Sequence, residues 1–341
     1  MGHHFVTIKD IARTLNVSTS TVSRALRDTY DVNQETKEKV LALAAQLNYR
    51  PNSNATGLAR GRTHNLGVVL PFITNYYFST VITGIQEIAY NKGYNIILYV
   101  TNDSPERELA ILRNLAISSL DGLLISISSS AADCSHFQEI MDHGVPVVFF
   151  DRVPEKVATS KVMQDDFNGA FEAVDHLISN GYQKIAYISG PQGLSLTEQR
   201  LQGYLHALKK HNIPVNEDWI VYSGFSQECG EEDTQHLLQL KDRPNAIFAA
   251  NDRKAIGALL TLRQHHIKAG SEFGVVGFTN DPMSAIISPS LTTVAEPAMD
   301  IGKTACELLL KHINKKHFQA EQVILPGRLI VRESSGTYHK G

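Results

Sequence analysis

A series of short apolar runs constrains the fold of most of this chain. The runs begin at Leu66, are rich in Val, Ile, Leu and Phe, and lack polar alternation. Strands of this kind are buried on both faces, as in parallel sheets covered by helices. The runs span residues 66–70, 95–100, 122–127, 145–150, 184–189, 219–223, 246–250, 273–278 and 329–332.

Segments with helical spacing separate these runs. They cover residues 76–92, 105–118, 135–143, 168–180, 197–211, 228–240, 253–266 and, late in the chain, 298–313. Alternating strands and helices predict a doubly wound α/β body. Because this body is large for one sheet, we expect two similar lobes with a first crossover near 163–165. The predicted lobes are 65–164 plus 296–324 and 165–295 plus 325–335, the late helix returning to the first lobe and the last strand to the second.

The N-terminal segment 5–50 has a different, all-helical pattern. Apolar residues recur at i, i+3, i+4 and i+7 from Ile8 to Leu15, with Thr7 as a plausible N-cap. A short break at 16–18 precedes a second helical segment at 19–26. A third segment, 33–47, offers apolar residues against which the first two helices can pack. The segment is therefore predicted to be a three-helix unit.

The second of these helices exposes a polar face with positive charge. Ser20, Ser23, Arg24 and Arg27 repeat at helical spacing opposite its apolar side. In a helix-turn-helix, the second helix enters the major groove of DNA, where arginine bonds guanine as a fork and short hydroxyl side chains allow close approach. The alternative is a small dimerisation or linker module whose charged face is only solvated.

The distribution of charge favours the DNA-binding interpretation. Residues 1–64 carry a net charge of +4 and the remainder −7, within a chain of net charge −3. A basic end on an acidic body is what neutralisation of phosphates at that end requires.

The linker 51–64 joins the two parts. Pro51 disfavours helix at the residue before it, and the polar stretch that follows is long enough for about two helical turns. Its large apolar residue, Leu58, stands near Arg60 and Arg62, as a wedge for the minor groove requires.

Several classes of protein are disfavoured. No apolar run approaches the roughly eighteen residues of a membrane helix and no signal peptide is evident, so we expect a cytoplasmic protein that spans no membrane. Cys134, Cys229 and Cys306 lie far apart, without metal-ligand spacing, and no cofactor or metal is expected. A sugar-processing enzyme or a transport receptor fused to the head is the competing class, but the chain lacks G-x-S-x-G, H-E-x-x-H, phosphate-loop and G-x-G-x-x-G motifs.

Head, linker and body together resemble the lactose-repressor/galactose-repressor family of bacterial transcription regulators. The resemblance rests on TIKDIARTLNVSTSTVSRAL, NYRPN, AIFAAND, and GVVGFTND followed by SPSLTTV, and it covers nearly the whole chain. It implies a body like that of periplasmic sugar-binding proteins and a homodimer that reads a pseudo-palindromic operator. It also implies a small-molecule effector, bound between the lobes, that changes how a pair of hinge helices sits on DNA.

Matching motifs carry DNA-binding roles onto particular residues. The resemblance implies that Leu58 opens the central base step. It assigns base edges to Thr19, Ser20 and Arg24, and phosphates to Thr21, Ser23 and Arg62.

For the effector, the family resemblance and the rule that ligands bind at the carboxyl ends of parallel strands select the same places. Carboxylate, amide and guanidinium groups there can form hydrogen bonds with hydroxyl groups, and an aromatic ring can cover the apolar face of a sugar. We therefore predict a carbohydrate, either a sugar or a sugar phosphate. The predicted contacts are Tyr77, Phe78, Asp151, Arg152, Arg200, Phe225, Asn251, Asp252, Thr279 and Asn280.

Other interpretations of these residues remain open. Asp252 could be only the N-cap of a helix that opens at Arg253, and Arg200 could be an exposed helix residue. Thr279 stands where many sugar-binding relatives have aspartate. Leu194 and Leu196 fall where a purine-binding relative has polar contacts, which disfavours a purine. The second functional hypothesis is a global regulator controlled by a nucleoside or a protein partner.

Overall fold

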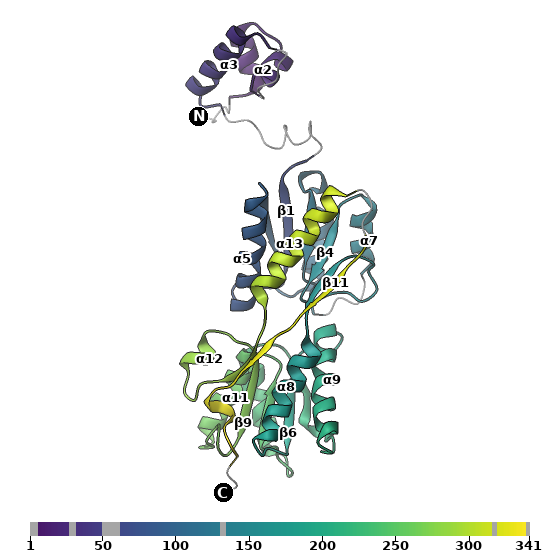
Figure 1. Cartoon of the computed structure of the whole chain (residues 1–341), viewed down its shortest axis with the longest axis vertical. Coiled ribbons are helices and arrows are strands. Elements are labelled where there is room, and N and C mark those ends of the chain that lie inside the picture. Colours follow the sequence, from purple (N-terminus) through teal and green to yellow (C-terminus); the bar gives the residue numbers. More distant parts are fainter. Residues whose placement is uncertain (1–5, 27–31, 50–61, 130–133, 316–318, 339–341) are drawn as a thin grey trace. The chain divides into compact units, whose positions relative to one another are not determined.

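The computed structural model describes residues 6–26, 32–49, 62–129, 134–315 and 319–338 (Figure 1). The chain forms two compact units, 1–63 and 64–341. They are called the head and the body below, and each is described by itself.

Within its described residues the head contains three helices, α1 (Ile8–Leu15), α2 (Thr19–Leu26) and α3 (Gln34–Gln46), which confirms the predicted helical head. The Asp10 carboxylate accepts the Thr7 backbone N–H at 2.8 Å, so the first turn of α1 is capped. Asn16 has φ of 52°, a left-handed conformation that ends α1 and turns the chain toward α2. The buried core includes Ile11, Val22 and Val40, one residue from each helix.

The first lobe of the body contains a six-stranded sheet of order β11-β5-β4-β3-β1-β2 in which every pairing is parallel. Its strands are β1 (Asn65–Leu70), β2 (Asn95–Val100), β3 (Gly122–Ile125), β4 (Val147–Phe150), β5 (Lys161–Gln164) and β11 (Gln322–Leu325). Its helices are α5 (Tyr76–Asn91), α6 (Pro105–Asn114), α7 (Ser135–Asp142) and α13 (Ala298–Asn314), with a 3-10 turn at Ile117–Ser119.

The second lobe repeats the plan with the order β12-β10-β9-β8-β6-β7, and here β12 is antiparallel to β10. Its strands are β6 (Ile185–Ser189), β7 (Ile220–Tyr222), β8 (Ala246–Ala249), β9 (Gly274–Thr279), β10 (Thr292–Ala295) and β12 (Arg328–Ile330). Its helices are α8 (Asp166–Ser179), α9 (Ser195–Lys210), α10 (Gln227–Gln239), α11 (Asp252–Gln264) and α12 (Met283–Ile286), with 3-10 turns at Glu217–Trp219 and Glu333–Ser335. The predicted doubly wound, two-lobed fold is confirmed.

The sequence pattern missed three strands, β5, β10 and β11. Each is only four residues long, and all three carry polar residues at one or both ends. β11 lies at the edge of its sheet, where alternate residues are exposed, so it lacks the continuous apolar run of a central strand. The run at 219–223 also begins differently from expectation, because Trp219 ends a 3-10 turn and β7 starts at Ile220.

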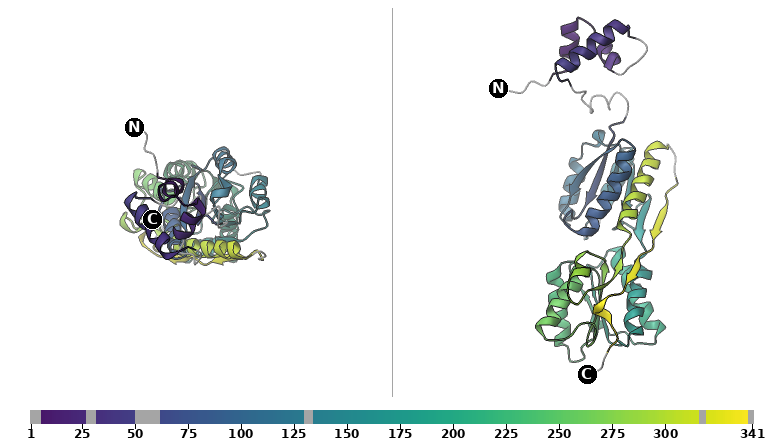
Figure 2. Two further views of the ribbon diagram at one scale, coloured as in Figure 1. Left: turned by 90° about the horizontal axis from the view of Figure 1, so that it is seen from above. Right: turned by 60° about the vertical axis from the view of Figure 1, so that its left-hand side comes forward.

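The chain passes between the lobes from β5 to α8, from β10 to α13, and from β11 to β12. The late segments α13, β11 and β12, drawn in yellow, can be followed from one lobe to the other (Figure 2). Multiple passages between two lobes are typical of hinged binding proteins, since each passage is short enough to act as part of a hinge. In the described part of the chain, no helix is long and apolar enough to cross a membrane.

Close packing of two helices holds α13 against the first lobe. A Cβ atom built at Gly84 of α5 would lie 2.3 Å from the Met299 carbonyl oxygen. One built at Gly302 of α13 would lie 2.1 Å from the Val81 carbonyl oxygen. Glycine at both positions therefore allows the two backbones to touch.

We predict that Gly84→Ala destabilises the body even though alanine is the better helix former by about 1 kcal/mol. The added methyl group meets backbone 2.3 Å away, which forces the helices apart. The expected net loss is about 2 kcal/mol in the free energy of unfolding, measured by urea denaturation. Thr83→Ala, at the exposed neighbouring position, should change stability by no more than about 0.5 kcal/mol. Equal effects of the two substitutions would contradict close packing.

Candidate functional site

In the head, α2 holds its predicted DNA-contacting residues on the side away from its core. Val22 and Ala25 are buried, whereas Thr19, Ser20 and Arg24 are exposed. Thr21 and Ser23 are half-buried. The Ser18 hydroxyl lies 2.7 Å from that of Ser20 and 2.8 Å from that of Thr21, so the start of the helix presents a cluster of hydroxyl groups.

The roles of the individual DNA-contacting residues stay predictions. Arg62 is exposed near the C-terminal end of the head unit, and Leu58 lies outside the described residues. The exposed side of α2 is nonetheless suited to DNA, because it combines short hydroxyl side chains with an arginine.

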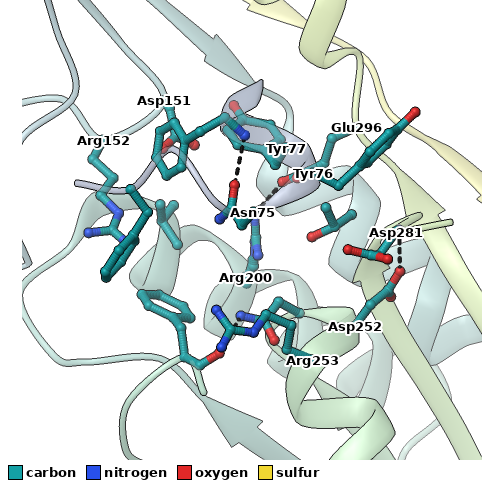
Figure 3. Close-up of a pocket in the computed structure, with 16 residues that line it drawn as sticks. Asn75, Tyr76, Tyr77, Asp151, Arg152, Arg200, Asp252, Arg253, Asp281 and Glu296 are labelled. Carbon is teal, nitrogen blue, oxygen red and sulfur yellow. Dashed lines mark hydrogen bonds and ion pairs between the residues drawn. The ribbon is translucent and has the colours of Figure 1, made fainter. Parts of the chain in front are cut away.

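In the body, a pocket lies between the two lobes at the carboxyl ends of the strands (Figure 3). Segments that follow β1 and β4 contribute from the first lobe, and segments that follow β7, β8 and β9, together with α9, contribute from the second. The lining residues are Phe72, Asn75, Tyr76, Tyr77, Phe78, Asp151, Arg152, Leu196, Arg200, Phe225, Asn251, Asp252, Arg253, Thr279, Asp281 and Glu296.

The structure brings together nearly all of the residues predicted to contact an effector. Tyr77, Phe78, Asp151, Arg152, Arg200, Phe225, Asn251, Asp252 and Thr279 line the pocket. Asn280 is not among the lining residues, because its carboxamide oxygen accepts an N–H from Arg332 at 2.7 Å. Whether the lining residues contact a ligand stays a prediction.

Arg200 is buried, so the interpretation of it as an exposed helix residue is wrong. Its Nε donates to Asp166 at 2.7 Å and its Nη2 to Glu296 at 2.8 Å. Its Nη1 donates to the carbonyl oxygen of Ala250, and the guanidinium lies over the Phe278 ring, 3.7 Å from the ring centre. Burial of this charge is tolerated because two carboxyl groups and a carbonyl surround it.

The N-cap of α11 is Asn251, so the interpretation of Asp252 as the cap is wrong. The Asn251 side-chain oxygen accepts the Lys254 N–H at 2.8 Å, and its Nδ2 donates to the Phe225 carbonyl at 3.1 Å. Asp252 is the first helical residue. Its carboxylate accepts the Thr293 hydroxyl at 2.5 Å and the Asp281 N–H at 2.7 Å, which ties α11 to β10 and to the loop after β9.

On the first-lobe side, Asp151 and Arg152 are fixed by hydrogen bonds. Arg152 Nη1 donates to Asp103 at 2.7 Å and to the Ser129 hydroxyl at 3.0 Å. Its guanidinium lies over the ring of Phe225 from the second lobe, 5.1 Å from the ring centre. Asp151 adopts φ of 59° and accepts the Ser126 hydroxyl at 3.2 Å.

Sequence reasoning missed several lining residues. They are Phe72, Asn75, Tyr76, Arg253, Asp281 and Glu296. The strand-end rule could have found Glu296, which follows directly after β10, but β10 itself was not recognised. Asn75 could have been identified as the cap of α5, since its side chain accepts the Phe78 N–H at 2.8 Å.

Burial changes the acid–base behaviour of the pocket. It raises the pKa of Asp166 to about 6, that of Asp252 to about 7 and that of Glu296 to about 8, although Arg200 opposes the rise for Asp166 and Glu296. Burial also raises the pKa of Asp151. Carboxyl groups that titrate near neutral pH can both accept and donate hydrogen bonds to a bound molecule.

Comparison with known proteins agrees with these two units. Residues 7–52 match the bacterial regulatory proteins of the lacI family, and residues 174–335 match a periplasmic binding protein-like domain. The HTH-type transcriptional repressor PurR of Photobacterium profundum is 34% identical over 333 residues, which cover 96% of this chain and 98% of that protein. The chain belongs to the LacI family. Catabolite control protein A of Priestia megaterium is 33% identical, with 97% of this chain and 99% of that protein covered.

Solved structures of LacI-family proteins match as well. The lac repressor dimer bound to operator and the anti-inducer ONPF aligns with a TM-score of 0.85 and 26% identity, over 98% of this chain and 100% of that chain. A complex of the transcriptional regulator CelR with cellobiose aligns with a TM-score of 0.74 and 27% identity, over 96% and 99%. The predicted family is thus confirmed, and the curated relatives are transcriptional regulators.

The raised pKa of Glu296 predicts how the stability of this LacI-family protein depends on pH. A carboxyl whose pKa is higher in the folded state than its usual 4.5 holds its proton more tightly when folded, so its stabilising contribution is lost as pH rises through about 8. The free energy of unfolding should therefore fall by on the order of 1 kcal/mol more between pH 6 and 9 in the wild type than in Glu296→Gln. Urea denaturation at several pH values measures the free energy of unfolding of the wild type and of the variant. If the two free energies changed with pH in parallel, the raised pKa of Glu296 would be contradicted.

Proposed function

We propose that this protein is a repressor whose affinity for operator DNA is set by a carbohydrate, a sugar or a sugar phosphate, bound between the lobes. The observation that carries the proposal is the composition of the interlobe pocket. Carboxyl groups, two amides and guanidinium groups surround a space that aromatic rings also line. Both lobes contribute to it, so a bound ligand would be held by residues on either side of the hinge.

The residues of the pocket fit the chemistry of a sugar. Asp151 and Asp281 supply acceptors for hydroxyl protons, and Phe78 and Phe225 supply apolar surface for the ring carbons. Leu196 lines the same space. It offers no hydrogen bond to a purine base. Similarity to the CelR–cellobiose complex, and to a LacI-family regulator of Enterococcus faecium with bound ribose at 29% identity and a TM-score of 0.69, also supports a carbohydrate.

A second candidate is a global regulator controlled by a nucleoside or a protein partner. Similarity to catabolite control protein A, whose name describes control of catabolism, supports this alternative. In that case the pocket would have a different occupant or only a structural role.

In the proposed mechanism, DNA is bound by a homodimer. One head presents only a few side chains to base edges, and two heads across a two-fold axis double that number on a pseudo-palindromic operator. Similarity to the operator-bound lac repressor dimer supports this assembly. Effector binding changes the angle between the lobes through the passages that connect them, and so changes the spacing of the two heads.

Two substitutions separate base reading from phosphate binding. We predict that Arg24→Ala relaxes the preference for one base pair, with a loss of about 1–3 kcal/mol on the preferred operator and a smaller loss on random DNA. Arg62→Ala should weaken binding to operator and random DNA alike, because a phosphate contact does not depend on sequence. Fluorescence anisotropy with both DNAs measures the losses. Equal losses on the two DNAs for Arg24→Ala would contradict the base-reading role.

The proposed function is tested by selecting bound sequences from random duplex DNA with the full-length protein. The affinity for the selected sequence is then measured with and without sugars and sugar phosphates. An enriched palindrome whose affinity shifts with one carbohydrate supports the whole proposal. If a palindrome is enriched but no carbohydrate changes the affinity for it, the DNA-binding role stands and the second candidate is favoured. No enriched sequence at low salt would refute the role of α2 as the reader of DNA.

A further inference from the structure

Two of the three guanidinium groups that line the pocket, those of Arg152 and Arg200, are already engaged with acidic groups of the protein. Arg200, the most deeply placed of them, contacts both Asp166 and Glu296. Arg152 contacts Asp103, and its Nη1 also donates to Ser129. An anionic ligand would therefore have to compete with carboxyl groups that are part of the fold.

The acidic groups of the pocket outnumber the basic ones. Four carboxyl side chains line it, those of Asp151, Asp252, Asp281 and Glu296, against the guanidinium groups of Arg152, Arg200 and Arg253. Asp166 adds a further acid directly behind Arg200. Arg253 is exposed, so water and salt screen its charge. Once these acids are ionised, the balance of charge at the buried end of the pocket is unfavourable to an anion.

Glu296 occupies a hydrogen-bonding position on Arg200 that a ligand could otherwise use. Its carboxyl is buried, with 6% of the side chain exposed, and it accepts from Nη2 of Arg200. In Figure 3 it lies among the residues that face the pocket. A phosphate or carboxylate that bound Arg200 as a side-on fork through Nε and Nη2 would compete with the oxygens of Asp166 and Glu296 that already accept from these two atoms. It would leave a buried carboxyl without its partner, which is costly.

We propose that Glu296 is the specificity-determining residue of the pocket, and that by engaging Arg200 it makes the pocket select uncharged sugars and reject their phosphorylated or carboxylated derivatives. This inference rests on the proposed function, and it narrows a sugar or a sugar phosphate to an uncharged sugar. A hydroxyl group can donate to Glu296 or Asp151 without breaking the Arg200 contact, because a carboxyl oxygen accepts more than one hydrogen bond.

The preference for uncharged sugars over anionic derivatives should depend on pH. The charged and titratable groups that act on Glu296 are Arg200 on α9, Asp166 on α8, Asp151 after β4 and Asp252 on α11, with Tyr77 on α5 nearby. Burial among them raises the pKa of Glu296 to about 8. As pH rises through this value, Glu296 becomes ionised and repels an anionic ligand more strongly. Discrimination against anions should therefore increase from pH 6 to pH 9.

The experiment compares neutral sugars with their uronates, such as glucose with glucuronate and galactose with galacturonate. Uronates suit the comparison because their own carboxylates stay ionised over this range of pH, whereas phosphate esters titrate near pH 6. Isothermal titration calorimetry on the full-length protein gives the ratio of the two affinities at pH 6, 7.5 and 9. Glu296→Gln removes the ionisable group and keeps the oxygen that accepts from Arg200. Glu307→Gln, at an exposed position of α13 outside the pocket, is the matched control.

For the wild type and Glu307→Gln, we expect the neutral sugar to bind more tightly than its uronate, by a ratio that grows about tenfold between pH 6 and 9. For Glu296→Gln, the ratio at pH 9 should be about tenfold smaller than in the wild type and should grow less between pH 6 and 9. A wild type that prefers the uronate, or a ratio that Glu296→Gln leaves unchanged at pH 9, overturns the inference while a carbohydrate effector still stands. If the wild type binds neither member of any pair, and sugars and sugar phosphates leave operator affinity unchanged, the carbohydrate effector of the proposed function fails, and the inference fails with it.

Discussion

The buried guanidinium of Arg200 connects two of the passages that join the lobes of the body. Its two acidic partners belong to two different passages between the lobes, because Asp166 follows β5 and Glu296 follows β10. A buried charge without partners would cost several kcal/mol, so these passages are held where they can meet the arginine. Any change in the angle between the lobes must preserve these contacts or exchange them for contacts to a ligand.

The side chains around Arg200 also have structural roles. Asn75 and Asn251 cap α5 and α11, and Asp252 ties α11 to β10 through the Thr293 hydroxyl. Arg152 links two loops of the first lobe and reaches the ring of Phe225 in the second. Because the same groups hold the loops and line the pocket, much of the site is ordered before a ligand arrives. Such preorganisation reduces the loss of side-chain freedom on binding.

Burial gives the carboxyl groups of this site an unusual chemistry. The raised pKa values of Asp166, Asp252 and Glu296 follow from the removal of water around several acids at once. A single arginine moderates this effect for Asp166 and Glu296 but does not cancel it. Carboxyl groups with such pKa values can donate as well as accept hydrogen bonds near neutral pH.

The sequence by itself determined the family, the helical head and the two-lobed parallel fold, because these depend on local periodicity and on motifs of adjacent residues. Continuous apolar runs identify central strands, and Ile8 to Leu15 identify a helix, without knowledge of their neighbours. Most of the pocket residues also followed from the sequence, since parallel strands bring their carboxyl ends to one edge. The short strands β5, β10 and β11 did not follow from the sequence, because it is pairing with neighbouring strands that stabilises them. Only the tertiary structure decided that Glu296 engages Arg200, that Asn251 rather than Asp252 caps α11, and that Asn280 contacts Arg332. These are contacts between residues 52 and 96 positions apart, or choices between adjacent polar side chains, and local pattern contains no information about either.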